Sequence, residues 1–196
     1  MWSRRFFLIV VTVALCGFSA AQQTPPTPDK SAPANIEGLL EKQFGDQFKA
    51  LTDISPMIAD LDGDGVDDIV IAATAKNPLM DAAEHKFKVI DPYYGFFGVG
   101  DPKITSTFAS TDPQTTAYVL VIVHGSGTDA WQSEQPKAKF VVINLPFKKL
   151  AVKRLQVRKK VQNAIYAVEN SADGMTSAIY FDGKKYKYEP MGSELH

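Results

Sequence analysis

The chain has 196 residues, with 21 basic and 22 acidic side chains and a single cysteine. This charge balance gives no support for a nucleic-acid partner, and one cysteine excludes an internal disulfide or a zinc site built from thiolates. The fold must therefore depend on a hydrophobic core, which a chain of this length can bury.

The first 21 residues have the three-part order of a secretory signal peptide. Two arginines precede an apolar run, residues 6–16, and a segment containing small residues ends at Ala21. The run is shorter than the ~20 residues of a membrane span, which favours cleavage after Ala21 over an anchor helix. We predict export to the periplasm or the exterior, with no stable membrane insertion afterwards. An uncleaved anchor and a lipoprotein processed at Cys16 are the alternatives.

After cleavage, 19 basic and 22 acidic residues remain, and no cysteine. Residues 22–34, QQTPPTPDKSAPA, contain four prolines and nothing large and apolar, so we predict a disordered linker. Asn35 then has the position of a helix N-cap, apolar residues follow at helical spacing, and Gly45 stands where a C-terminal glycine belongs. We predict a single β-rich domain over residues 35–196 that begins with this short amphipathic helix.

Strand signals dominate the rest of the chain. The run from Tyr118 to Val123 is apolar at nearly every position, which indicates a central strand covered on both faces. Asp182 and Gly183 between alternating aromatic residues predict a hairpin. The predicted fold class is mainly β (α+β), an antiparallel sheet or small sandwich with the N-terminal helix packed on it. The predicted strands are 56–60, 69–74, 117–124, 139–145, 164–169, 177–181 and 186–188.

Two further segments each allow two interpretations. Prolines and glycines interrupt residues 76–114, which predicts a long ordered loop that either covers a sheet edge or binds a ligand. Seven of the thirteen residues from Lys148 to Lys160 are basic. They indicate either a solvated edge that lysine protects from aggregation, or a patch for an anionic envelope polymer or lipid surface.

The strongest chemical signal is the segment DLDGDGVDD at residues 60–68. Its carboxylates stand at positions one, three, five and nine of a loop in which two glycines, Gly63 and Gly65, permit tight turns. Calcium takes six to eight oxygens at roughly 2.3 to 2.6 Å, and alternate residues of a curled loop can face one centre. We predict one structural Ca²⁺ ion; the alternative is an acidic turn without a metal. The predicted ligands are Asp60, Asp62, Asp64, Asp68 and the carbonyl of Val66.

An EF-hand requires a glutamate at position twelve, where this sequence has Ile71. The segment instead resembles the FG-GAP and VCBS repeat families, in which a DxDGDGxxD loop joins two antiparallel strands and holds calcium. The resemblance covers only residues 54–74 in one copy, so it implies a calcium hairpin and not a propeller. Without a bidentate glutamate, the dissociation constant is expected on the order of 10⁻⁴ to 10⁻³ M.

Residues 118–131 resemble the strand and His-Gly oxyanion loop of α/β-hydrolases. That fold needs a later G-x-S-x-G elbow, an acid and a histidine, but Ser126 lies in Gly-Ser-Gly and the only later histidine is His196. An exported hydrolase that uses the His124 to Gly127 turn is therefore the alternative function.

No other segment indicates catalysis. The three histidines lack paired metal spacing, and we interpret each of them as an isolated surface or strand-end residue. The glycine-rich segment at residues 95–100 lacks the lysine of a phosphate loop, so no nucleotide partner is expected. We predict a non-catalytic, calcium-stabilised β-domain that binds an envelope or extracellular ligand, or has a structural role there.

Overall fold

The structure is a computed structural model that describes residues 35–98, 117–169 and 174–193. This part of the chain is mainly β, with two sheets and three short helices. The predicted signal peptide and linker lie outside the described residues. None of the described helices is both long enough and apolar enough to cross a membrane.

All seven predicted strands are present, with bounds that differ by a few residues, and three further strands join them. The elements in chain order are α1 (Ile36–Phe44), β1 (Phe48–Ala50), β2 (Met57–Ala59), β3 (Asp68–Ala75), β4 (Lys88–Ile90), α2 (Pro92–Phe97), β5 (Tyr118–His124), the 3₁₀ helix η1 (Gly127–Gln132), β6 (Ala138–Val142), β7 (Lys149–Val157), β8 (Lys160–Val168), β9 (Met175–Phe181) and β10 (Tyr186–Ser193).

Helix α1 begins and ends where the sequence predicts. The Asn35 side chain accepts a hydrogen bond from the Gly38 amide at 2.8 Å, and Gly45 follows the last turn with a φ of 91°. Leu40 and Phe44 are fully buried. Two more helices, α2 and η1, were not predicted.

One sheet has six strands in the order β1-β3-β5-β6-β4, with β2 paired to β3. Its central strand, β5, pairs antiparallel with β3 and β6, whereas β4 pairs parallel with β6. Val121 of β5 shares a core cluster with Leu40 and Phe44 of α1. Its neighbour Ile122 shares another cluster with Ile165 and other side chains of the second sheet. The prediction of a central strand covered on both faces is therefore confirmed.

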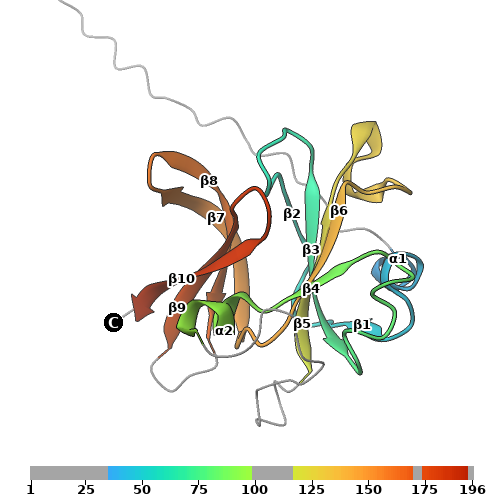
Figure 1. The fold of residues 1–196 in the computed structure, drawn as a ribbon, viewed down its shortest axis with the longest axis horizontal. Coiled ribbons are helices and arrows are strands. Elements are labelled where there is room, and N and C mark those ends of the chain that lie inside the picture. The colour runs from blue at the N-terminus through green and yellow to red at the C-terminus, as the bar shows by residue number, and fades with distance from the viewer. Residues whose placement is uncertain (1–34, 99–116, 170–173, 194–196) are drawn as a thin grey trace, which may run out of the picture.

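The second sheet has four antiparallel strands in the order β10-β9-β8-β7. Figure 1 shows it beside the six-stranded sheet, with α1 on the opposite side of that sheet. The β9–β10 hairpin is confirmed: Tyr186 pairs with Phe181, and the Asp182 carboxylate accepts from the amides of Lys184 and Lys185 at 2.9 Å. Most of the basic stretch, residues 149–157, forms β7, which is an edge strand of this sheet.

The prediction of one continuous loop over residues 76–114 was wrong in its described part. That part contains β4 and α2, while residues 99–114 lie outside the described residues. Asp91 caps α2 by accepting from the Tyr94 amide at 2.9 Å, Pro92 begins the helix, and Gly98 ends it in the left-handed conformation. The proline and glycine that suggested a loop are thus the start and stop of a short helix.

Candidate metal centre

The acidic loop connects two paired strands. Strand β2 runs antiparallel to β3, with Ala59 opposite Asp68, so residues 60–67 form the turn between them. Gly63 and Gly65 have φ values of 81° and 86°, in the left-handed region that glycine enters without strain. The predicted arrangement, a tight acidic loop between antiparallel strands, is confirmed.

The carboxylate of Asp60 organises the backbone of this turn. Its Oδ1 accepts from the Gly63 amide at 2.7 Å and its Oδ2 accepts from the Gly65 amide at 2.9 Å. The carbonyl oxygen of Asp60 accepts from the side chain of Asn163, on β8, at 2.7 Å. The loop is therefore held in a curled shape and is tied to the second sheet.

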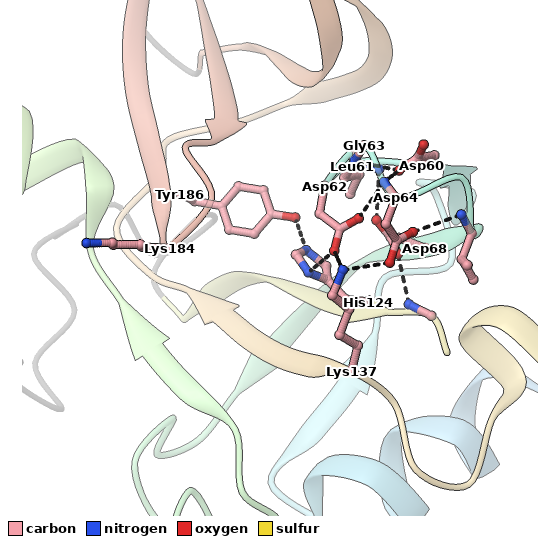
Figure 2. A network of polar contacts seen from close by, with 12 residues as sticks. Asp60, Leu61, Asp62, Gly63, Asp64, Asp68, His124, Lys137, Lys184 and Tyr186 are labelled. Atoms are coloured by element: carbon pink, nitrogen blue, oxygen red, sulfur yellow. Dashed lines mark hydrogen bonds and ion pairs between the residues drawn. The ribbon is translucent and has the colours of Figure 1, made fainter. Parts of the chain in front are cut away.

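Three of the predicted ligands lie together. Asp60, Asp62 and Asp68 each place a carboxylate oxygen within 4.8 Å of the others, a group that could hold a metal ion. Figure 2 shows the three residues close together at this turn, with Asp68 contributed by the start of β3. The sequence spacing therefore identified a real cluster of carboxylate oxygens.

Asp68 is the buried member of this group. Its Oδ2 accepts from the Leu61 amide and its Oδ1 from the Gly125 amide, both at 2.8 Å. Burial raises the pKa of the Asp68 carboxyl to about 7; the two amide donors oppose this rise, and the nearby charges of Asp62 and Asp60 add to it. A positive charge beside Asp68 would favour its ionised form at neutral pH.

Asp64 lies outside the three-carboxylate group. Its Oδ2 is 2.6 Å from the Nζ of Lys137, which is also 2.7 Å from Asp62 Oδ2. The hydrogen bond from Lys137 lowers the pKa of Asp64, and both carboxylates raise the pKa of Lys137. Val66 donates its amide to Asp64 Oδ1 at 2.8 Å. The roles of Asp64 and of the Val66 carbonyl as ligands stay predictions.

His124 also contacts this centre, although nothing in its local sequence indicates the contact. Its buried ring lies between the acidic loop and the second sheet, with Nδ1 at 3.4 Å from Asp62 Oδ2 and Nε2 at 2.7 Å from the hydroxyl of Tyr186 (Figure 2). Burial lowers the pKa of His124, against the opposing charge of Asp62, and burial raises the pKa of Tyr186. These directions fit a neutral imidazole that accepts from the Tyr186 hydroxyl.

His124 ends β5, so the interpretation as a strand-end residue is confirmed, but the interpretation as an isolated residue was wrong. Tyr186 is 62 positions along the chain from His124, so no local spacing could show their contact. The same holds for Lys137, which is 75 positions from Asp62. Both contacts depend on how the sheets are arranged, which periodicity does not reveal.

We expect the Tyr186→Phe substitution to lower the free energy of unfolding by about 1–3 kcal/mol, because it leaves a buried ring nitrogen of His124 without its hydrogen-bond donor. Urea unfolding measures the change. Tyr180→Phe is the control, since Tyr180 is partly exposed and is expected to change stability by less than about 0.5 kcal/mol. Equal effects of the two substitutions would contradict the role given to the Tyr186 hydroxyl.

The geometry gives no support to a hydrolase centre at the His124 to Gly127 turn. Strand β5 ends at His124, as predicted, and Ser126 precedes η1 with its amide donating to the Ala130 carbonyl at 3.0 Å. Both ring nitrogens of His124 face other partners, Asp62 and Tyr186, so this histidine is not placed to activate Ser126.

No protein-family model, curated protein or solved structure matches the chain. The resemblance to FG-GAP and VCBS repeats therefore rests on the loop sequence and on its place between two antiparallel strands.

Proposed function

We propose that the loop from Asp60 to Asp68 binds one calcium ion, and that this ion stabilises an exported, non-catalytic β-domain. The observation that carries the proposal is the separation of the oxygens of Asp60, Asp62 and Asp68, which lie within 4.8 Å of one another. Two oxygens on one calcium ion, each at roughly 2.3 to 2.6 Å from it, are at most about 5 Å apart. The group thus has the dimensions of a calcium site.

The chemistry of the donors also favours calcium. The three clustered ligands are all carboxylates, which suit a hard cation, and none is a cysteine or histidine of the kind that zinc prefers. Within the described residues, no lysine or arginine lies at ion-pair distance from Asp60 or Asp68. A divalent ion would supply the positive charge that these two carboxylates need.

A structural role for the ion follows from the neighbours of the loop. Asn163 joins Asp60 to the four-stranded sheet, and the Gly125 amide joins Asp68 to the end of β5 in the six-stranded sheet. An ion that fixes the loop therefore fixes a junction of both sheets.

We infer that the domain is a sandwich with α1 packed on one face. We also infer that its stabilised surface binds an envelope or extracellular ligand.

The proposal for export rests on residues 1–21 and their signal-peptide pattern. Export is compatible with weak calcium binding at the loop, because extracellular calcium modules have dissociation constants on the order of 10⁻⁴ to 10⁻³ M. The single-copy resemblance to FG-GAP and VCBS repeats agrees with such a site. Mass spectrometry of the protein secreted by its host is the direct test, since cleavage after Ala21 places Gln22 at the new N-terminus.

The test of the ion is a thermal melt of the purified protein in chelator and in calcium. Calcium at ten times its dissociation constant should add about 1.4 kcal/mol to the stability of the native state. For a domain of this size, the melting midpoint should rise by about 3–6 °C. The Asp62→Asn variant should lose this rise, because it removes one charge from the three-carboxylate group.

Glu41→Gln is the matched control for this melt. It removes the same charge from an exposed position on α1, so its response to calcium should equal that of the unmodified protein. The absence of a calcium-dependent rise in the unmodified protein would refute the site. An equal rise with magnesium would keep a metal site at the loop and refute its assignment to calcium.

A further inference from the structure

A cavity of about 360 Å³ lies between α2 and the beginning of β10, and its lining includes none of the carboxylates of the metal centre. Figure 1 shows α2 against β10, the outermost strand of the four-stranded sheet. Ligand-binding cavities in proteins range from roughly 300 to 1,000 Å³, so this volume suits a small molecule or the end of a chain.

One wall of the cavity is aromatic. The rings of Phe96 and Tyr188 lie 5.3 Å apart between their centroids, and both residues line the cavity. Tyr188 is buried and fixed, because its hydroxyl donates to Glu169 at 2.7 Å, whereas Phe96 is 49% exposed. The cavity therefore offers a rigid ring and an accessible ring, against which a flat apolar group can pack edge to face.

The lining of the cavity also carries positive charge. Lys185 and Lys187 line it; Lys185 has no ion pair among the described residues, and the one pair of Lys187, with Asp182, is long at 3.8 Å. Among the described lining residues the one carboxylate is that of Asp91, which already accepts from the Tyr94 amide at 2.9 Å and from the Asn144 side chain at 2.6 Å. The charge of the cavity is thus complementary to an anion.

The helical wall leaves room for a ligand at Gly95. A Cβ atom built on Gly95 would have no neighbouring heavy atom within 4 Å, although this residue lines the cavity from a helix. The space beside it is open, and its backbone does not have the left-handed φ that requires glycine. A side chain can therefore be introduced here to fill the cavity without disturbing the fold.

We propose that this cavity binds an aromatic carboxylate, with its ring packed against the rings of Phe96 and Tyr188 and its carboxylate beside Lys185 and Lys187. This chemistry occurs both in a free aromatic acid and at the C-terminus of a peptide that ends in an aromatic residue. The proposal does not depend on calcium, so its test is carried out in chelator, where the metal centre does not contribute.

The probe is 3-phenylpropanoate, titrated into ¹⁵N-labelled protein and followed by amide chemical shifts. We expect saturable shifts concentrated at Gly95, Phe96 and Tyr188. The neutral analogue 3-phenylpropanamide should bind about tenfold more weakly, because it lacks the charge that the lysines complement. Ac-Gly-Gly-Phe with a free carboxylate separates the two sources: tighter binding than the probe identifies a peptide end, and equal or weaker binding identifies a free acid.

Two variants make the test specific. Gly95→Leu should abolish binding by filling the cavity while its urea unfolding midpoint stays at or above that of the unmodified protein. The double substitution Lys185→Met and Lys187→Met should weaken the carboxylate about tenfold and leave the amide unchanged. Unaltered binding in folded Gly95→Leu, equal binding of acid and amide, or the absence of saturable shifts would each overturn the proposal.

Discussion

Replacement of Gly125 by alanine is expected to lower the free energy of unfolding by about 3 kcal/mol. A Cβ atom at this position would clash with the carbonyl oxygen of Asp67, and it would lie 2.8 Å from the carbonyl carbon of Ala130 and 2.9 Å from the amide nitrogen of Trp131. All three atoms belong to the backbone, so no side-chain rotation can relieve the contact.

The substitution acts on the metal centre as well as on packing. The Gly125 amide donates to Asp68 Oδ1, and a shift of this backbone would weaken the buried hydrogen bond. Urea unfolding in chelator measures the loss of stability. Gly95→Ala is the matched control: the same methyl group meets no heavy atom within 4 Å there, and stability should stay equal or rise. A loss below about 1 kcal/mol at Gly125 would contradict the packing argument.

The second large effect is expected at Lys137. Its ammonium group lies between Asp62 and Asp64, at 2.7 and 2.6 Å from their oxygens, and so competes with a metal ion for the same carboxylates. Lys137→Met keeps a long apolar stem but removes the charge. We expect this variant to bind calcium about ten times more tightly, equivalent to about 1.4 kcal/mol, and to melt at a lower temperature than the unmodified protein in chelator.

Calorimetric calcium titration together with thermal melts checks this expectation. Lys42→Met is the control, since Lys42 pairs with Glu134 at 2.8 Å on the exposed side of α1 and its loss removes an equal charge. Unchanged affinity in Lys137→Met would place the ion away from Asp62. Weaker affinity would mean that the lysine orders the loop for the ion and does not compete with it. The Lys137→Met substitution also removes the ion pair of Asp64, which leaves the Asp64 carboxylate free for its predicted role as a ligand.

The sequence predicted those features of the structure that depend on residues close together in the chain. The burial of both faces of β5 follows from an unbroken apolar run. The bounds of α1 follow from Asn35 and Gly45 at its two ends. The cluster of Asp60, Asp62 and Asp68 follows from even-numbered positions along the β2–β3 turn and at the first residue of β3. In each case the residues that determine the structure are neighbours in the chain.

The rest of the centre could not be predicted because its partners are distant in sequence. Lys137 precedes β6, and Tyr186 begins β10, yet each reaches the centre at the β2–β3 turn. Helix α2 was missed for another reason. Pro92 and Gly98 mark the ends of a helix as readily as they mark a loop, and six residues are too few to establish a helical period.

Three contacts that surround the acidic loop join residues far apart in the chain. Asp68 and Gly125 are 57 positions apart, Asp62 and Lys137 are 75 apart, and Asp60 and Asn163 are 103 apart. Contacts of such separation complete late in folding, since the chain between them must first be organised. Interactions absent from the transition state change the rate of unfolding and leave the rate of folding almost unaltered. A calcium ion bound at this loop would therefore lengthen the time for which an already folded molecule persists.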